Sequence, residues 1–98
     1  MAKFFRNNIG IGYLKISFME LVKYSQNGFP ICDECSKDLI GYEDIILIPI
    51  LNQAYCSECG KSVLKRTKDY PEDRDYRRHK EEFWKSYFNI KEEMQDVI

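Results

Sequence analysis

The chain has 98 residues and a formal net charge of −1, and 44% of its residues are hydrophobic. This length allows one small domain, and a core of that size is expected to need an additional stabilising cross-link. The nearly balanced charge excludes a general polyanion binder, and no apolar run approaches the ~20 residues of a transmembrane helix.

The first thirty residues predict one strand and one helix. Residues 11–16 have the composition of a short strand. Ser17 and Glu20 have the spacing of a capping box, and apolar residues follow at helical intervals. Together with the stop signal of Asn27 and Gly28, this pattern predicts a helix over residues 17–27.

Four cysteines follow in two pairs, Cys32 with Cys35 and Cys56 with Cys59. A gap of two residues lets one tight turn direct two sulfur atoms at one point, and two such turns complete a tetrahedron. The spacing predicts one structural Zn²⁺ ion, bound by four thiolates at about 2.3 Å each. Because four thiolates leave no position for a water molecule, no enzymatic activity is expected at this metal.

Other uses of the cysteines are less favoured. Two disulfides would suit a secreted protein, but the first eight residues lack the apolar region and cleavage site of a signal peptide. We therefore expect a cytoplasmic location, where paired Cys-x-x-Cys turns usually bind metal. A single iron ion would give a rubredoxin-like electron carrier, whereas a thioredoxin-like redox pair needs only one such motif, beside a βαβ unit.

The residues between the two pairs predict a β-hairpin. Residues 45–51 form an apolar run, and Ala54 and Tyr55 come just before the second pair. Pro49 is expected at an edge or a bulge, because it has no N–H to donate to a central ladder. Gly60 is expected to adopt the positive φ that closes the second metal turn.

The last thirty residues predict one long helix. Pro71 suits its first turn, and no glycine or proline interrupts the chain from there to Ile98. Large side chains recur at alternating spacings of four and three, which is a heptad-like pattern. This seam consists of Tyr76, Lys80, Phe83, Tyr87, Ile90, Met94 and Val97.

The aromatic stripe of this helix has two interpretations. It can complete the core, or it can form the surface that binds a partner protein or a second copy of the chain. In the second case the expected anchors are Phe83, Trp84 and Tyr87, because large aromatic side chains dominate binding energy at interfaces.

Residues 61–80 carry eight basic and four acidic side chains. A nucleic-acid surface there would use five basic residues. These are Lys65, Arg66, Arg74, Arg77 and Arg78. The alternative is a solvated helix face, because Arg77 with Glu81 and Arg78 with Glu82 are i,i+4 pairs that explain much of the pattern.

A Cys-x-x-Cys turn, a hairpin and a second Cys-x-x-Cys that opens a helix resemble the treble-clef zinc finger. Residues 32–41 and 54–59 are similar to half of a LIM-type module. This resemblance implies a treble-clef or zinc-ribbon core. Residues 73–76 and 80–83 are similar to the tail of Gin-type zinc-finger anti-sigma proteins, which implies a partner in the transcription machinery.

These observations predict a small zinc-stapled α+β domain, with an N-terminal helix and a long C-terminal helix around the finger. Its segments are residues 1–30 (strand and helix), 31–68 (four-cysteine finger) and 69–98 (amphipathic aromatic helix), in one cooperative domain. The leading hypothesis is a non-catalytic zinc module that binds another protein, without a membrane partner. A nucleic-acid-binding zinc ribbon comes second, and a rubredoxin-like electron carrier third.

Overall fold

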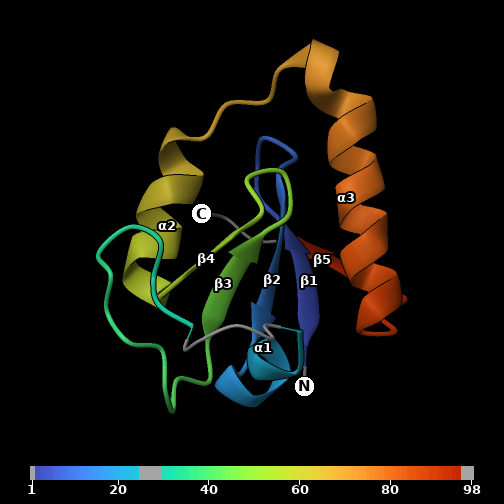
Figure 1. Ribbon diagram of the computed structural model, residues 1–98. Coiled ribbons are helices and arrows are strands. Elements are labelled where there is room, and N and C mark those ends of the chain that lie inside the picture. Colours follow the sequence, from blue (N-terminus) through green and yellow to red (C-terminus); the bar gives the residue numbers. More distant parts are fainter. Residues whose placement is uncertain (1, 25–29, 96–98) are drawn as a thin grey trace.

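A five-stranded sheet forms the centre of the protein, with α2 and α3 on its opposite sides (Figure 1). The computed structural model describes residues 2–24 and 30–95. The elements are β1 (Lys3–Arg6), β2 (Gly12–Ile16), α1 (Phe18–Tyr24), β3 (Ile45–Ile48), β4 (Gln53–Tyr55), α2 (Ser57–Arg66), a 3-10 turn (Pro71–Asp73), α3 (Arg74–Tyr87) and β5 (Glu93–Gln95). The strand order is β4-β3-β2-β1-β5, and among the strands in the described part of the chain only β1 and β5 are parallel neighbours. The predicted α+β class is confirmed.

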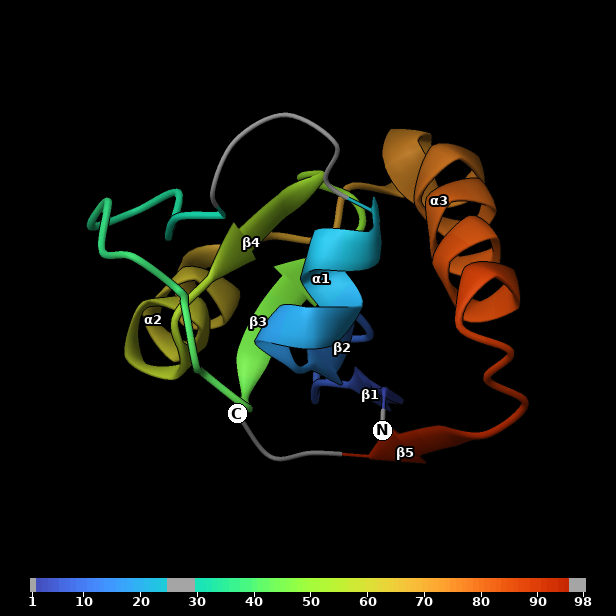
Figure 2. The same ribbon diagram turned by 60° about the horizontal axis from the view of Figure 1, so that its bottom comes forward.

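Apolar side chains lie on both faces of the sheet. Phe4 pairs with Leu14, and Leu14 pairs with Leu47, so these side chains share one face. Ile46 belongs to the other face, where α2 packs so tightly that a Cβ atom on Gly60 would lie 2.6 Å from the Ile46 Cβ. Figure 2 shows the sheet lying between α2 and α3 from a second direction. The absence of a side chain at position 60 therefore sets how close α2 lies to β3.

A buried ionic network holds α3 against the turn between β1 and β2. The Glu81 side chain is almost inaccessible, and its Oε2 accepts the Gly12 N–H at 3.0 Å. Its other oxygen lies 3.1 Å from Arg6 Nη1. Arg77 Nη1 donates to the Gly10 carbonyl at 2.7 Å. Because a buried carboxylate is tolerated only when it is paired, this network specifies where α3 meets the sheet.

The capping box at the start of α1 is confirmed. Ser17 N–H donates to Glu20 Oε1 at 2.9 Å, and Glu20 N–H donates to Ser17 Oγ at 3.3 Å. The helix runs to Tyr24. The rest of the predicted range 17–27, including the stop at Asn27 and Gly28, lies outside the described residues.

The strand predicted over residues 11–16 and the hairpin predicted between the cysteine pairs are both present, as β2 and as β3 with β4. Pro49 lies in the turn directly after β3, where no ladder bond is required of it. Asn52 completes this turn with φ +54°, and its N–H donates to the Ile48 carbonyl at 2.9 Å. No pattern in the sequence predicts β1 or β5.

The prediction of one long C-terminal helix is wrong, because α3 ends at Tyr87. Asn89 follows in the left-handed conformation, with φ +56°. Its N–H donates to the Ser86 carbonyl at 3.1 Å, and the Ile90 N–H donates to the Lys85 carbonyl at 2.8 Å. These two bonds form a Schellman motif, in which asparagine replaces the usual glycine as the stop signal.

The chain then forms β5 beside β1, so residues 69–98 are not a single helix. Glu93 pairs with Phe4 in the sheet, and its carboxylate lies 2.8 Å from Lys85 Nζ and 3.0 Å from Arg6 Nε. The first four residues of the heptad-like seam lie on α3, Ile90 and Met94 come after it, and Val97 lies outside the described residues. Within residues 2–24 and 30–95, no helix combines the length and the apolar character needed to span a membrane.

Candidate metal centre

The first cysteine pair lies on a tight turn. The Ser36 N–H donates to the Cys32 carbonyl, and the Cys32 N–H donates to the Lys37 carbonyl, both at 2.8 Å. Ser36 has φ +63°, so a serine occupies a left-handed position at which glycine would be easier to accommodate. A β-bridge between Ile31 and Asp38 closes the base of this turn.

The second pair lies at the start of α2. Cys56 is the N-cap residue, and Cys59 lies in the first helical turn. The Gly60 N–H donates to the Cys56 carbonyl at 2.8 Å. The prediction that Gly60 has a positive φ is wrong, because this residue is helical and its role is the close approach to β3.

Asp33 fixes the first turn to β4. Its backbone N–H donates to the Ala54 carbonyl at 2.9 Å, and its carboxylate accepts the Ala54 N–H at 2.8 Å. Ala54 lies two residues before Cys56, so these two bonds place the two cysteine pairs face to face. No local pattern around Asp33 predicts this role, because its partner Ala54 lies 21 residues further along the chain.

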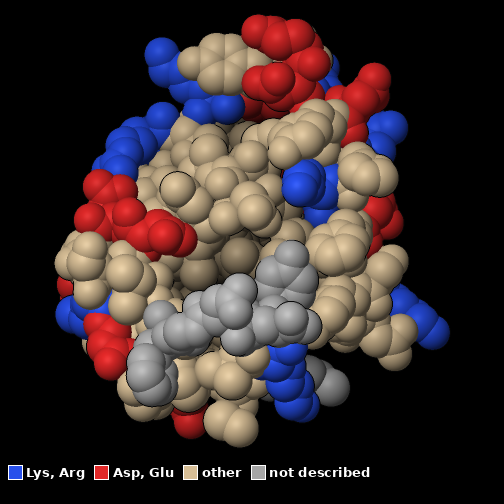
Figure 3. All heavy atoms as spheres, in the orientation of Figure 1, with Lys and Arg blue, Asp and Glu red and all other residues tan. Residues whose placement is uncertain are grey.

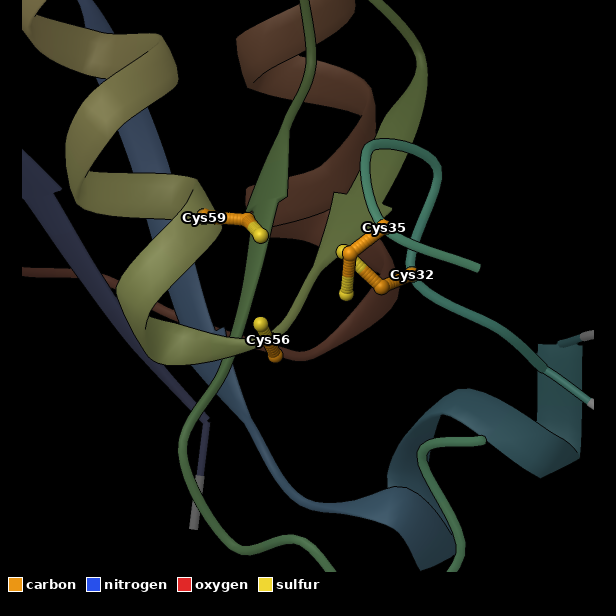
Figure 4. Close-up of side chains that lie close together, drawn as sticks. All are labelled: Cys32, Cys35, Cys56 and Cys59. Atoms are coloured by element: carbon orange, nitrogen blue, oxygen red, sulfur yellow. The ribbon is translucent and has the colours of Figure 1, made fainter. Parts of the chain in front are cut away.

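The four sulfur atoms converge on one point (Figure 4). All lie within 4.8 Å of one another, and none forms a disulfide. A tetrahedral ion with bonds of about 2.3 Å would hold its sulfurs about 3.8 Å apart, so only small movements are needed. Cys32 and Cys56 are buried, whereas Cys35 is exposed and Cys59 is half-buried.

The thiols of this cluster ionise unequally. Burial acts against the Cys32 thiolate, but backbone N–H groups of Cys35, Cys56 and Glu34 donate to its sulfur and lower its pKa to about 7. The hydrogen bond to Cys56 raises the pKa of Cys59 to about 12, and burial acts in the same direction. Four converging sulfurs cannot all be thiolates without a cation between them, and a bound divalent metal deprotonates such thiols. The donor set therefore fits a metal ion.

The predicted partner-binding residues have different surroundings. Phe83 and Tyr87 are 47% and 44% exposed. Trp84 is 2% exposed and belongs to the core cluster, so its prediction as a surface anchor is wrong. The reason is the orientation of α3, which directs Glu81 and Trp84 toward the sheet.

Three of the five predicted nucleic-acid-binding residues are in ion pairs. Arg66 pairs with Glu34, while Arg74 and Arg77 both lie close to Asp69. The other two, Lys65 and Arg78, are exposed. On the face seen in Figure 3, Lys and Arg side chains lie beside Asp and Glu around the rim and do not form one broad basic patch.

Comparison with known proteins gives no match to a protein-family model, to a curated protein or to a solved structure. The metal-binding interpretation therefore depends on the geometry of the four cysteines alone. The treble-clef, LIM-type and Gin-type resemblances stay predictions from the sequence.

Proposed function

We propose that the protein is a non-catalytic zinc module of the treble-clef type that binds another protein through the outer side of α3. The zinc-module part of this proposal is supported by the convergence of four cysteine sulfurs, two from a tight turn and two from the start of α2. A hairpin connects these two elements, as in a treble clef. Thiolate ligands in this number favour one structural Zn²⁺ ion, and an iron ion is the alternative.

A structural role for the metal follows from the number of ligands. Four sulfurs complete the tetrahedron, so no site remains at which a water molecule or substrate could be activated. Elemental analysis of the purified protein tests this assignment. We expect one zinc per chain and a colourless protein, whereas one iron per chain and a red protein would support the electron carrier instead.

The outer side of α3 supports the second part of the proposal. Phe83 and Tyr87 are almost half exposed, and their ring centroids are 6.4 Å apart. Each also makes an edge contact with the buried Trp84 ring, at 5.4 Å and 5.9 Å. The two exposed rings are therefore positioned by the core. Positioned aromatic side chains lose little conformational entropy on binding, and they are enriched among binding hot spots.

The test of this surface begins with affinity capture from native cells and identification of the captured protein, followed by titration of the purified pair. We expect the double variant Phe83→Ser/Tyr87→Ser to raise the dissociation constant at least about tenfold. Its zinc content and circular dichroism should match those of the unaltered protein.

Tyr70→Ser is the matched control for this titration. Tyr70 is 50% exposed but lies on the segment between α2 and α3, away from Phe83 and Tyr87. Equal affinity of the double variant and this control for the partner would contradict the proposed binding surface. The identity of the captured protein would also test the prediction of a transcriptional partner.

A further inference from the structure

A cavity of about 480 Å³ lies beneath the segment that joins α2 to α3. In Figure 1 this segment passes over the β1–β2 turn and the β3–β4 turn at one end of the molecule. Ile11 and Leu51, from these two turns, line the cavity, and residues 66–70 form another part of its wall. Its volume lies in the range of pockets that bind small organic ligands.

Two tyrosines border this cavity. Tyr70 and Tyr76 both line it and are 50% and 52% exposed. Half-exposed aromatic rings beside a cavity can stack on a planar ligand, and on Tyr76 the Lys80 Nζ atom already lies over the ring, 5.6 Å from its centroid. Leu51, which is 38% exposed, provides an apolar surface for the same ligand, whereas Ile11 is buried. The two tyrosines and Leu51 suit a flat aromatic ring system such as a nucleobase.

Three cations also line the cavity, namely Arg66, Lys68 and Arg77, against the two carboxylates of Asp69 and Asp73. The lining residues thus carry one net positive charge. The Asp69 carboxylate is already shared, since it lies 3.2 Å from Arg77 Nη1 and 3.5 Å from Arg74 Nε. Arg66 is also paired with Glu34, which leaves the exposed Lys68 as the most available cation.

Arg77 adds a fixed positive charge to the wall of this cavity. Its Nε atom is buried and has no hydrogen-bond acceptor among the described residues. The nearest carboxylate oxygen in an ion pair with it, Glu81 Oε2, lies 3.8 Å away, which exceeds hydrogen-bond length. Because this Nε atom is buried, it cannot itself bind a ligand in the cavity, and the guanidinium acts on an anionic ligand there through its positive charge.

We infer that this cavity binds one nucleotide unit, with its base against Tyr70 or Tyr76 and its phosphate near Lys68 and Arg77. The unit can be a free mononucleotide or one residue of a single-stranded nucleic acid, because both present the same base and phosphate. This site is separate from Phe83 and Tyr87, so it stands independently of the proposed protein-binding surface.

The first experiment is an NMR titration of the ¹⁵N-labelled zinc-loaded protein. The probes are AMP, UMP, adenosine, inorganic phosphate and a single-stranded hexanucleotide. We expect the amide signals of Ile11, Leu51, Lys68 and Tyr70 to shift with both mononucleotides, and to shift less with adenosine or phosphate alone. An unchanged spectrum with every probe at millimolar concentration would overturn the inference.

Two pairs of variants locate the binding. Lys68→Glu and Tyr70→Ala should each weaken nucleotide binding about tenfold, through the lost charge and the lost stacking. Lys61→Glu and Met19→Ala are the matched controls, because these exposed residues do not line the cavity. They should change the dissociation constant less than about twofold. Arg77 is not substituted, since it also holds the β1–β2 turn.

The outcomes separate the two sources of the nucleotide. If the hexanucleotide and a mononucleotide bind equally well, the site takes free nucleotides. If the hexanucleotide binds much more tightly and Lys68→Glu and Tyr70→Ala still weaken it, the site takes one residue of a strand. Equal weakening by Lys61→Glu and Lys68→Glu would show diffuse electrostatic binding and would contradict a defined site.

Discussion

At the scale of single residues, Phe83 and Trp84 are neighbours in the chain with opposite environments. Phe83 is 47% exposed, whereas Trp84 is 2% exposed and stacks on Phe88 with ring centroids 5.9 Å apart. One helical step of about 100° separates two adjacent side chains, which is enough to move one of them from the surface to the core.

We therefore expect Trp84→Ala to affect the stability of the protein more than its affinity for a partner. Removing a buried tryptophan should lower the free energy of unfolding by about 3–5 kcal/mol, because the cavity it leaves cannot fill completely. Urea unfolding of the zinc-loaded protein measures this change. Phe83→Ala serves as the control and should cost less than about 1 kcal/mol. Similar losses for both variants would contradict the assigned orientation of α3.

The sequence predicts that the four cysteines cluster, but it does not predict which aromatic residues are buried and which are exposed. The spacing of Cys32 and Cys35 defines a local turn whatever the rest of the fold does. In contrast, the burial of Trp84 depends on which side of α3 meets the sheet. That choice is made by Glu81, whose partners Arg6 and Gly12 lie far away in the sequence.

At the scale of elements, the end of α3 depends on one asparagine. Asn89 has φ +56°, a conformation that costs most L-residues about 1–2 kcal/mol. We expect Asn89→Ala to destabilise the protein by about 1 kcal/mol and Asn89→Gly to be neutral or stabilising. Thermal unfolding of the three proteins compares them. If the alanine variant were as stable as the glycine variant, the left-handed stop would not be needed.

The position of β5 is expected to depend on pH through Glu93. The hydrogen bond from Lys85 holds the pKa of Glu93 below its ordinary value of 4.5, against a smaller effect of burial and with further help from Arg6. A lowered folded-state pKa means that this stabilisation is fully present above the ordinary value. It is lost as the pH falls through the lowered pKa.

Glu93→Gln tests this dependence. The substitution should cost up to about 1 kcal/mol at neutral pH, as is usual for partly exposed ion pairs. The difference in unfolding free energy between the two proteins should shrink as the pH decreases, because the native carboxylate then becomes protonated. Denaturant unfolding at a series of pH values measures this difference in unfolding free energy. A difference that stays constant with pH would exclude the ion pairs of Glu93 as its source.

The elements predicted correctly are those with local signals. The α1 capping box needs only Ser17 and Glu20, and the β3–β4 hairpin needs only one apolar run and a turn. β1 and β5 were missed because each has only three or four residues and its stability comes from pairing with distant strands. Asn89 was the overlooked signal for the end of α3.

At the scale of the whole molecule, the metal and the folding free energy are closely linked. A four-cysteine zinc site contributes on the order of 10 kcal/mol, while a domain of this size has a total stability of about 5–15 kcal/mol. We expect a strong chelator to unfold the protein, and added zinc to restore it. Circular dichroism follows both steps, and Mg²⁺ is the control that should not restore the fold. A chelated protein that kept its unfolding temperature would contradict a structural metal.

The pairing of β1 with β5 also bears on how the protein is made. Phe4 pairs with Glu93 although the two residues are far apart in the sequence, whereas a much shorter segment separates Cys32 from Cys59. On the ribosome, the cysteines emerge and can capture their ion while the residues of β5 are still being added. We therefore expect the sheet edge at β1 to stay open until residues 93–95 are available to pair with it.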